Sequence, residues 1–146
     1  MDQKRIVLGG LGAALVMMVG EFAVEPLFSS MQERFFSRLG LPLPGESAMI
    51  WLAVTLLVLG YVTVCMYAEF SFRSGAGFGI AAATGALVWL LSCFLPNVTL
   101  YTFGVVDGQF YLLTSAWPLV EIVVATVVGA AIHDRKRARR AAPVAS

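Results

Sequence analysis

Three glutamates lie within or at the edge of long apolar segments of this chain. Glu21 and Glu25 are four residues apart in the stretch VGEFAVEP, so on a helix they share one face. Glu121 lies in another apolar segment, three residues after Pro118. A charged residue at the centre of a membrane helix costs about 2.5–3.5 kcal/mol on insertion scales, so intramembrane carboxylates are typical of proton and ion sites. These residue types therefore predict the binding of protons or cations.

The surroundings of Glu21 and Glu25 along the chain disfavour ionisation. Neither has a basic residue within one turn of its own helix, and both lie toward the C-terminal, negative end of that helix. Desolvation and mutual repulsion act in the same direction. We expect at least one of them to be protonated or cation-bound at neutral pH, unless Arg34 or Arg38 folds back to form an ion pair.

Glu121 is predicted to differ because of the proline before it. A proline inside a helix bends or interrupts it, so Pro118 predicts a helix break with Glu121 near the N-terminus that follows. For all three residues, a purely structural role is the alternative to proton or cation binding. Glu25 and Glu21 would then reach external headgroups or pair with Arg34, and Glu121 would be a protonated side chain that donates a hydrogen bond to another helix.

The composition indicates that membrane helices hold these residues. The 146-residue chain is 59% hydrophobic and 13% charged, with a mean hydropathy of +0.83. Soluble domains are about half apolar and about a quarter charged. Four apolar segments, at about 6–25, 48–70, 76–95 and 110–133, approach or exceed the roughly 20 residues that cross a bilayer. We predict an all-α membrane protein, a four-transmembrane-helix bundle forming a single domain over residues 1–146.

An additional helix is predicted between the first two spans. Pro26 is expected to end the first helix, and apolar residues then recur at helical spacing opposite polar ones. This pattern predicts an external interfacial amphipathic helix at about 27–39. A loop with a few anchoring aromatic residues is the alternative.

The basic residues predict the orientation. Eight of the ten lie in the N-terminal segment, the loop between the second and third spans, and the tail 134–146, whereas Arg34 and Arg38 lie on the other side. The positive-inside rule then predicts a multi-pass protein of a bacterial inner (plasma) membrane with both termini in the cytoplasm. The basic tail is attributed to topology and anionic headgroups, so the expected partner is the lipid bilayer and no nucleic acid is expected.

Other classes of chemistry have little support. The single histidine, His133, lies at the cytoplasmic end of the fourth segment, far in depth from the glutamates. Cys65 and Cys93 are interpreted as packing residues, and no cysteine–histidine cluster occurs. We predict no catalytic residue, no metal and no cofactor, and an enzyme is the lowest-ranked class.

Two resemblances concern architecture alone. The four spans and an acidic first helix resemble the small multidrug resistance transporters, although those are shorter, have weaker charge bias and lack the external segment, so their mechanism is not transferred. A set of short motifs resembles a family of small four-helix bacterial inner-membrane proteins of unknown function, which implies a four-helix fold and no activity. These motifs are VGEF, Tyr67-Ala68, GAG, Trp89-Leu90, and Glu121 followed by GAAI.

Two functions are compatible with these residues. The first is transport or sensing of a proton, cation or small solute, with Glu21 and Glu121 inside the membrane and Glu25 as the outer carboxylate. The second is a non-catalytic accessory or assembly subunit that uses glycine-rich faces to form a homo-oligomer or a larger membrane complex. A cavity that reaches the glutamates favours the first, and a tightly packed bundle with exposed small residues favours the second.

Overall fold

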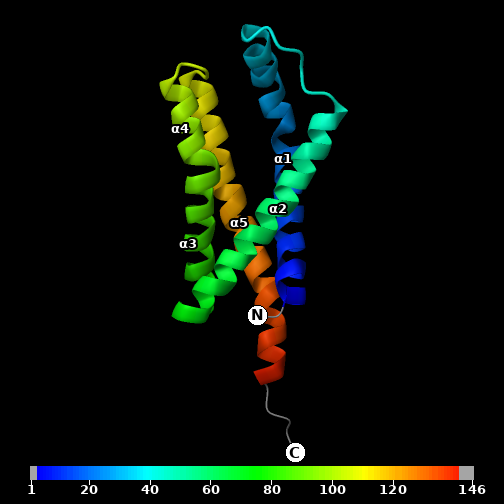
Figure 1. Ribbon diagram of the computed structural model, residues 1–146, viewed down its shortest axis with the longest axis vertical. Coiled ribbons are helices and arrows are strands. Elements are labelled where there is room, and N and C mark those ends of the chain that lie inside the picture. The colour runs from blue at the N-terminus through cyan, green and yellow to red at the C-terminus, as the bar shows by residue number, and fades with distance from the viewer. Residues whose placement is uncertain (1–2, 142–146) are drawn as a thin grey trace, which may run out of the picture.

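The computed structural model describes the backbone of residues 3–141 and the side chains of residues 3–134. Apart from its short connections the described chain is helical, and it contains no strand (Figure 1). Most of the predicted basic tail, 134–146, lies outside the described side chains. The elements in order are α1 (Gln3–Arg38), α2 (Glu46–Ser74), α3 (Phe78–Trp89), the π-helical turn η1 (Leu90–Phe94), α4 (Leu95–Thr102) and α5 (Gly108–Ala141).

Four helices are long and apolar enough to cross a membrane. They are Gln3–Arg38, Glu46–Ser74, Phe78–Thr102 and Gly108–Asp134, and each contains an 18-residue stretch with a mean hydropathy of 2.0, 2.3, 2.0 and 1.8, respectively. The third of these combines α3, η1 and α4 into one continuous rod. The predicted all-α fold is confirmed for the described chain, with four helices long and apolar enough to span a membrane.

Two helices continue through prolines that lie at or just after their predicted ends. α1 continues through Pro26 to Arg38, so residues 27–38 extend the first helix instead of forming a separate one. The third span continues through Pro96 to Thr102, beyond the predicted end at residue 95. At this point the π-helical turn shifts the hydrogen-bond register, with Leu95 N–H bonding to Leu90 O, and Pro96 falls in the first turn of α4, where a proline is tolerated.

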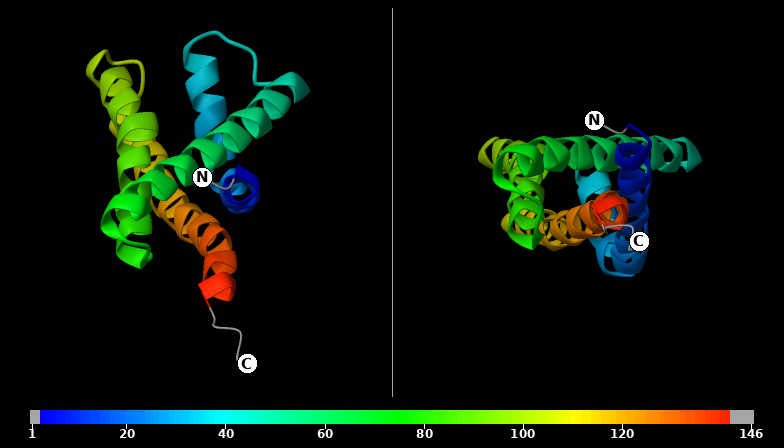
Figure 2. Two further views of the ribbon diagram at one scale, coloured as in Figure 1. Left: turned by 60° about the horizontal axis from the view of Figure 1, so that its bottom comes forward. Right: turned by 90° about the horizontal axis from the view of Figure 1, so that it is seen from below.

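The helices pack tightly at one end and diverge toward the other. We call the end that carries the α2–α3 turn the lower end, and the end that carries the α1–α2 and α4–α5 connections the upper end (Figure 1). The described termini of α1 and α5 both lie at the lower end. α2 crosses the other helices diagonally and departs from α4 toward the upper end, as both Figure 1 and Figure 2 show.

Glycines make the lower half compact. A Cβ built on Gly9 would lie 2.7 Å from the Gly129 carbonyl oxygen, and one on Gly60 would lie 2.6 Å from the Gly10 carbonyl oxygen. Small residues allow membrane helices this close approach, which side chains would prevent. The small-residue faces of α1, α2 and α5 are therefore used for contacts within the chain.

Candidate functional site

A large cleft occupies the upper half of the molecule, where the helices diverge. Its volume is about 810 Å³, and it is lined by α1, α2, η1, α4 and α5. Glu21, Glu25 and Glu33 contribute carboxylates, whereas no lysine, arginine or histidine lies among the described lining residues. Apolar and aromatic side chains, among them Phe22 and Trp117, form much of the remaining wall. The cleft thus combines an apolar surface with negative charge.

Glu121 lies directly behind this cleft, in contact with α1. Its side chain is only 6% exposed. A Cβ built on Gly20 would overlap Glu121 Oε1 and lie 2.9 Å from its Cδ, so the glycine is what makes room for the carboxyl group. Glu121 Oε1 has no hydrogen-bond partner among the described residues. A buried acceptor without a partner costs about 1–3 kcal/mol, which packing alone does not justify.

Glu21 and Glu121 are brought together by this contact between α1 and α5. Their side chains are close enough to interact electrostatically, and both also act on Cys93 of η1. Cys93, which the sequence indicated to be a packing residue, packs partly buried against the hydrophobic core and also lines the cleft. Three separate segments therefore converge on one polar cluster.

Both glutamates lie midway between the ionic ends of their helices. At 1.5 Å per residue, Glu21 is about 24 Å from Arg5 and about 20 Å from Arg34 along α1. Glu121 is about 20 Å from Asp134 and about 21 Å from Asp107. A helix that ended at Pro26 would have placed Glu21 only about 7 Å from its external end.

Pro118 does not break α5, which is continuous from Gly108 to Ala141. Its missing N–H leaves the Thr114 carbonyl without an intrahelical donor. Asn97 of α4 fills this position, with Nδ2 donating to Thr114 O at 3.1 Å. Trp89 Nε1 donates to the adjacent Ser115 O at 2.7 Å. Glu121 is therefore not at the start of a new helix, and the stabilisation expected from a helix N-terminus does not apply.

A buried donor lies on the same face of α5 as Glu121. Trp117 Nε1 is buried and has no partner among the described residues. Trp117 and Glu121 are four residues apart, and such pairs are about 5–6 Å apart between Cβ atoms. Trp117 lines the cleft, and an unpaired N–H and an unpaired carboxylate oxygen are thus both buried on this face of α5 among the described residues.

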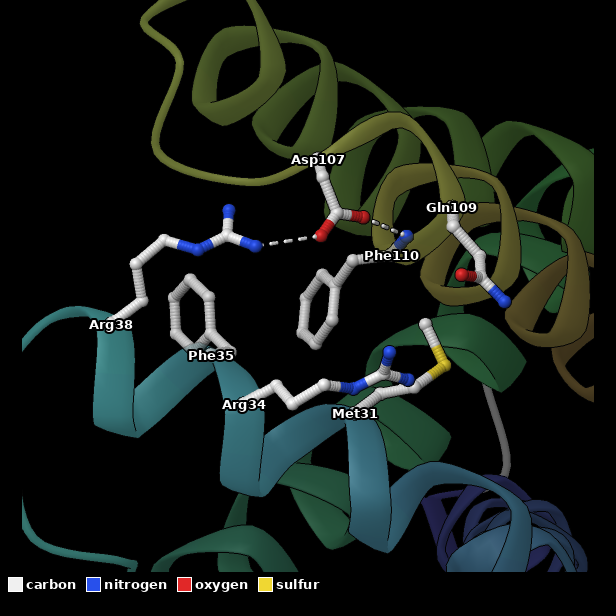
Figure 3. A pocket seen from close by; sticks show the side chains of 7 residues that line it. All are labelled: Met31, Arg34, Phe35, Arg38, Asp107, Gln109 and Phe110. Carbon is white, nitrogen blue, oxygen red and sulfur yellow. Dashed lines mark hydrogen bonds and ion pairs between the residues drawn. The ribbon is translucent and has the colours of Figure 1, made fainter.

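Arg34 and Arg38 were candidate ion-pair partners of Glu21 or Glu25, but each contacts a different residue (Figure 3). Arg38 Nη2 pairs with Asp107 Oδ2 at 3.1 Å, and Arg34 Nε donates to Ser30 O at 3.2 Å. Because α1 continues as a helix, Arg34 is about 20 Å from Glu21 and does not fold back. Glu25 is exposed at the edge of the cleft.

The ion pair at the upper end is part of a larger contact between α1 and the start of α5. The rings of Phe35 and Phe110 stack with centroids 5.0 Å apart. We call Phe35, Arg38, Asp107 and Phe110 the upper clasp. The Phe110 backbone N–H, which donates to Asp107 Oδ1 at 2.8 Å, together with Arg38 holds the pKa of Asp107 below its ordinary value of 3.8.

Comparison of this chain with known protein families, with curated proteins and with solved structures finds no match in any of the three. The cleft and the residues around it are therefore the basis for inferring its function.

The structure adds residues that sequence reasoning did not select. Asn97, Trp117 and Asp107 are the clearest. Asn97 had a usable signal, because an amide inside an apolar helix needs a partner. At the lower end, Tyr67 donates to Asp134 Oδ2 at 2.5 Å, and His133 Nδ1 lies 3.0 Å from Asp134 Oδ1.

The site contains no recognisable metal centre in the part of the chain that the structure describes. No group of three or more His, Cys, Asp or Glu side chains gathers there in a way that could hold a metal ion.

Proposed function

We propose that this chain transports a cationic solute across its membrane in exchange for protons, with Glu21 and Glu121 as the shared binding site. The observation that carries the proposal is the cleft, which has three carboxylates and no basic residue in its described lining. In the lining of an apolar cleft of about 810 Å³, such groups attract a cation and repel an anion.

The exchange follows from the proximity of the two carboxyl groups. Glu21 and Glu121 interact electrostatically, and charge on both is unfavourable in an apolar environment. Either a proton on one carboxyl group or a bound cation relieves that repulsion. Proton and solute then compete for one site. Binding of the cation releases the proton, and binding of a proton releases the cation.

The position of the site supports transport across the bilayer. α1 has 36 residues and is about 54 Å long, whereas the hydrocarbon core is about 30 Å thick. Its residues 27–38 therefore extend to the membrane surface, where their amphipathic pattern suits the interface. We place the upper end outside and the termini in the cytoplasm of a bacterial inner membrane, as the distribution of basic residues favours.

The alternative, an accessory subunit, has less support. That function requires small-residue faces that are free to dock onto partners. Gly9, Gly10, Gly60 and Gly129 instead contact one another's helices within the chain. The observation thus favours a chain whose small residues close its own lower end.

Reconstitution into liposomes tests the proposal. External Na⁺, tetramethylammonium or tetraphenylphosphonium would be added in turn, and luminal pH followed with an enclosed dye. At least one cation is expected to raise luminal pH with the natural chain. This signal should be lost in Glu21→Gln and Glu121→Gln but retained in Glu46→Gln, an exposed control outside the cleft. Equal signals in all four chains would overturn the proposal.

A further inference from the structure

The cleft opens sideways as well as upward. In the described chain α2 contacts α1, α3 and α5 but makes no contact with η1 or α4. The lining on these two sides comes from Met49, Leu52 and Ala53 of α2 and from Ser92 and Cys93 of η1. We call this opening, between residues 49–53 and residues 92–93, the lateral portal. Figures 1 and 2 both show α2 departing from the α3–α4 rod on this side.

The rim of the lateral portal is apolar and lies at the depth of lipid tails. Leu52 is about 9 Å along the axis of α2 from Glu46, the charged start of this helix. Leu91 of η1 is 55% exposed, and Ile50 of α2 is 66% exposed, on surfaces that a bilayer would cover. A molecule dissolved in the membrane can therefore reach the cleft without leaving the hydrocarbon.

The interior of the cleft selects the head group of such a molecule. Its carboxylates have no basic counter-charge among the described lining residues. Glu121 Oε1, buried behind the cleft, is a hydrogen-bond acceptor that has no partner among the described residues. Phe22 and Trp117 provide aromatic surface, which binds cations and alkyl chains. A positively charged N–H donor on an apolar chain satisfies all three features.

We propose that the solute is a long-chain protonated amine that enters from the outer leaflet through the lateral portal. This inference rests on the transport function proposed above and names its substrate class. The ammonium group lies between Glu21 and Glu121 and donates to Glu121 Oε1, and the alkyl chain extends through the portal toward lipid. A quaternary ammonium of the same length has the charge but no N–H, so it binds more weakly.

Photolabelling in lipid nanodiscs tests this assignment. The full chain is incubated with dodecylammonium that carries a diazirine in its alkyl chain, and labelled peptides are identified by mass spectrometry. Labels are expected on α2 residues 49–56 and on η1. Unlabelled dodecylammonium should compete about tenfold better than dodecyltrimethylammonium, the ratio for one lost hydrogen bond of about 1.4 kcal/mol.

Variants separate the portal from general lipid contact. Ala53→Trp narrows the portal and should reduce labelling there, whereas Val58→Trp adds the same side chain to an exposed position of α2 outside the portal and the cleft lining and should not. Glu121→Gln should also reduce labelling. An uncharged dodecanol that carries the same diazirine should label the portal residues of α2 and η1 no more strongly than it labels other lipid-facing residues.

The outcomes distinguish this inference from the transport proposal. Labelling that Ala53→Trp and Glu121→Gln leave unchanged, or that dodecanol reproduces, overturns the lateral portal and its amine. If tetramethylammonium still drives Glu121-dependent proton movement in that case, transport itself stands. If labelling is specific for the amine but none of the tested cations drives proton movement, the transport proposal is overturned and the amine-binding site stands.

Discussion

Glu121 is the residue whose position packing explains least. It is buried against Gly20 with one oxygen unpaired among the described residues, although an apolar side chain would fit a helix contact better. We expect Glu121→Met to raise the free energy of unfolding by about 1–3 kcal/mol, because it removes an unsatisfied buried acceptor and fills similar space. Thermal unfolding in detergent measures this, and cation-driven proton movement should be lost in the same variant. A less stable Glu121→Met chain would show that the backbone hydrogen bond from Glu21 to the carboxyl group outweighs its unsatisfied oxygen.

Gly20 provides a second test of the same contact. A methyl group at this position would overlap Glu121 Oε1, so Gly20→Ala should displace the carboxyl group and weaken cation binding. Gly12 is a matched control on the same helix. A methyl group there meets only the end of the flexible Ile132 side chain, which can move aside. We expect Gly12→Ala to bind tetraphenylphosphonium like the natural chain and Gly20→Ala to bind it less tightly, as titration calorimetry would measure. Equal affinities would contradict the role assigned to this contact.

At the scale of the elements, α4 supports the proline of α5. Asn97→Leu leaves the Thr114 carbonyl without its donor and should destabilise the chain by about 1–3 kcal/mol. Pro118→Ala restores a backbone N–H that can donate to the same carbonyl, so the Asn97 substitution should cost less in that background. A double-mutant cycle of unfolding free energies measures this coupling. Additive effects of the two substitutions would show that Asn97 does not compensate for the proline.

The upper clasp links α1 to α5 and depends on the charge of Asp107. The pKa of Asp107 is held below 3.8, so the folded state binds its proton more weakly than the unfolded state. The stabilisation is therefore complete above about pH 4 and is lost as the pH falls through the lowered pKa. Spin labels on Ser37→Cys and Gln109→Cys, in a chain with Cys65 and Cys93 replaced, should keep their separation at pH 5 and spread as the pH falls through the lowered pKa of Asp107, below 3.8.

Asp107→Asn is the matched control for this titration. It keeps the shape of the side chain but removes the charge that pairs with Arg38, so the labels should be spread at every pH. A distance distribution that changes with pH equally in both chains would assign the transition to another group.

The elements were predictable from sequence to the extent that hydropathy determines them. Four apolar segments became four spanning helices, because length and composition are local properties. The ends were not predictable, since α1 continues through Pro26 and a π-helical turn carries the third span past Pro96. The sequence also did not determine whether Glu21 and Glu121 lie together. Their proximity depends on a glycine contact between α1 and α5 that no periodicity within either helix reveals.

At the scale of the whole molecule, the two ends have different construction. Glycine contacts and the Tyr67–Asp134 hydrogen bond close the lower end, whereas at the upper end the clasp joins α1 to α5 on one side of the cleft. Transport as proposed requires the lower end to open when the upper end closes. Exposed helices at the upper end can move with little loss of packing, whereas the lower end must separate close backbone contacts. The structure therefore corresponds to an outward-open state in the proposed orientation.

Cysteine accessibility in intact cells tests orientation and cleft together. Single cysteines would replace Ser29, which lines the cleft, its neighbour Ser30, which does not, and Ser74 at the lower end, in a chain with Cys65 and Cys93 replaced. A membrane-impermeant maleimide added outside should modify the first two positions and not the third, because the positive-inside rule places the lower end in the cytoplasm. Added dodecylammonium should then slow the reaction at position 29 while position 30 reacts as before, since the ligand occupies the cleft beside only one of these adjacent residues. Modification of position 74 alone would reverse the orientation, and equal protection of positions 29 and 30 would place the amine outside the cleft.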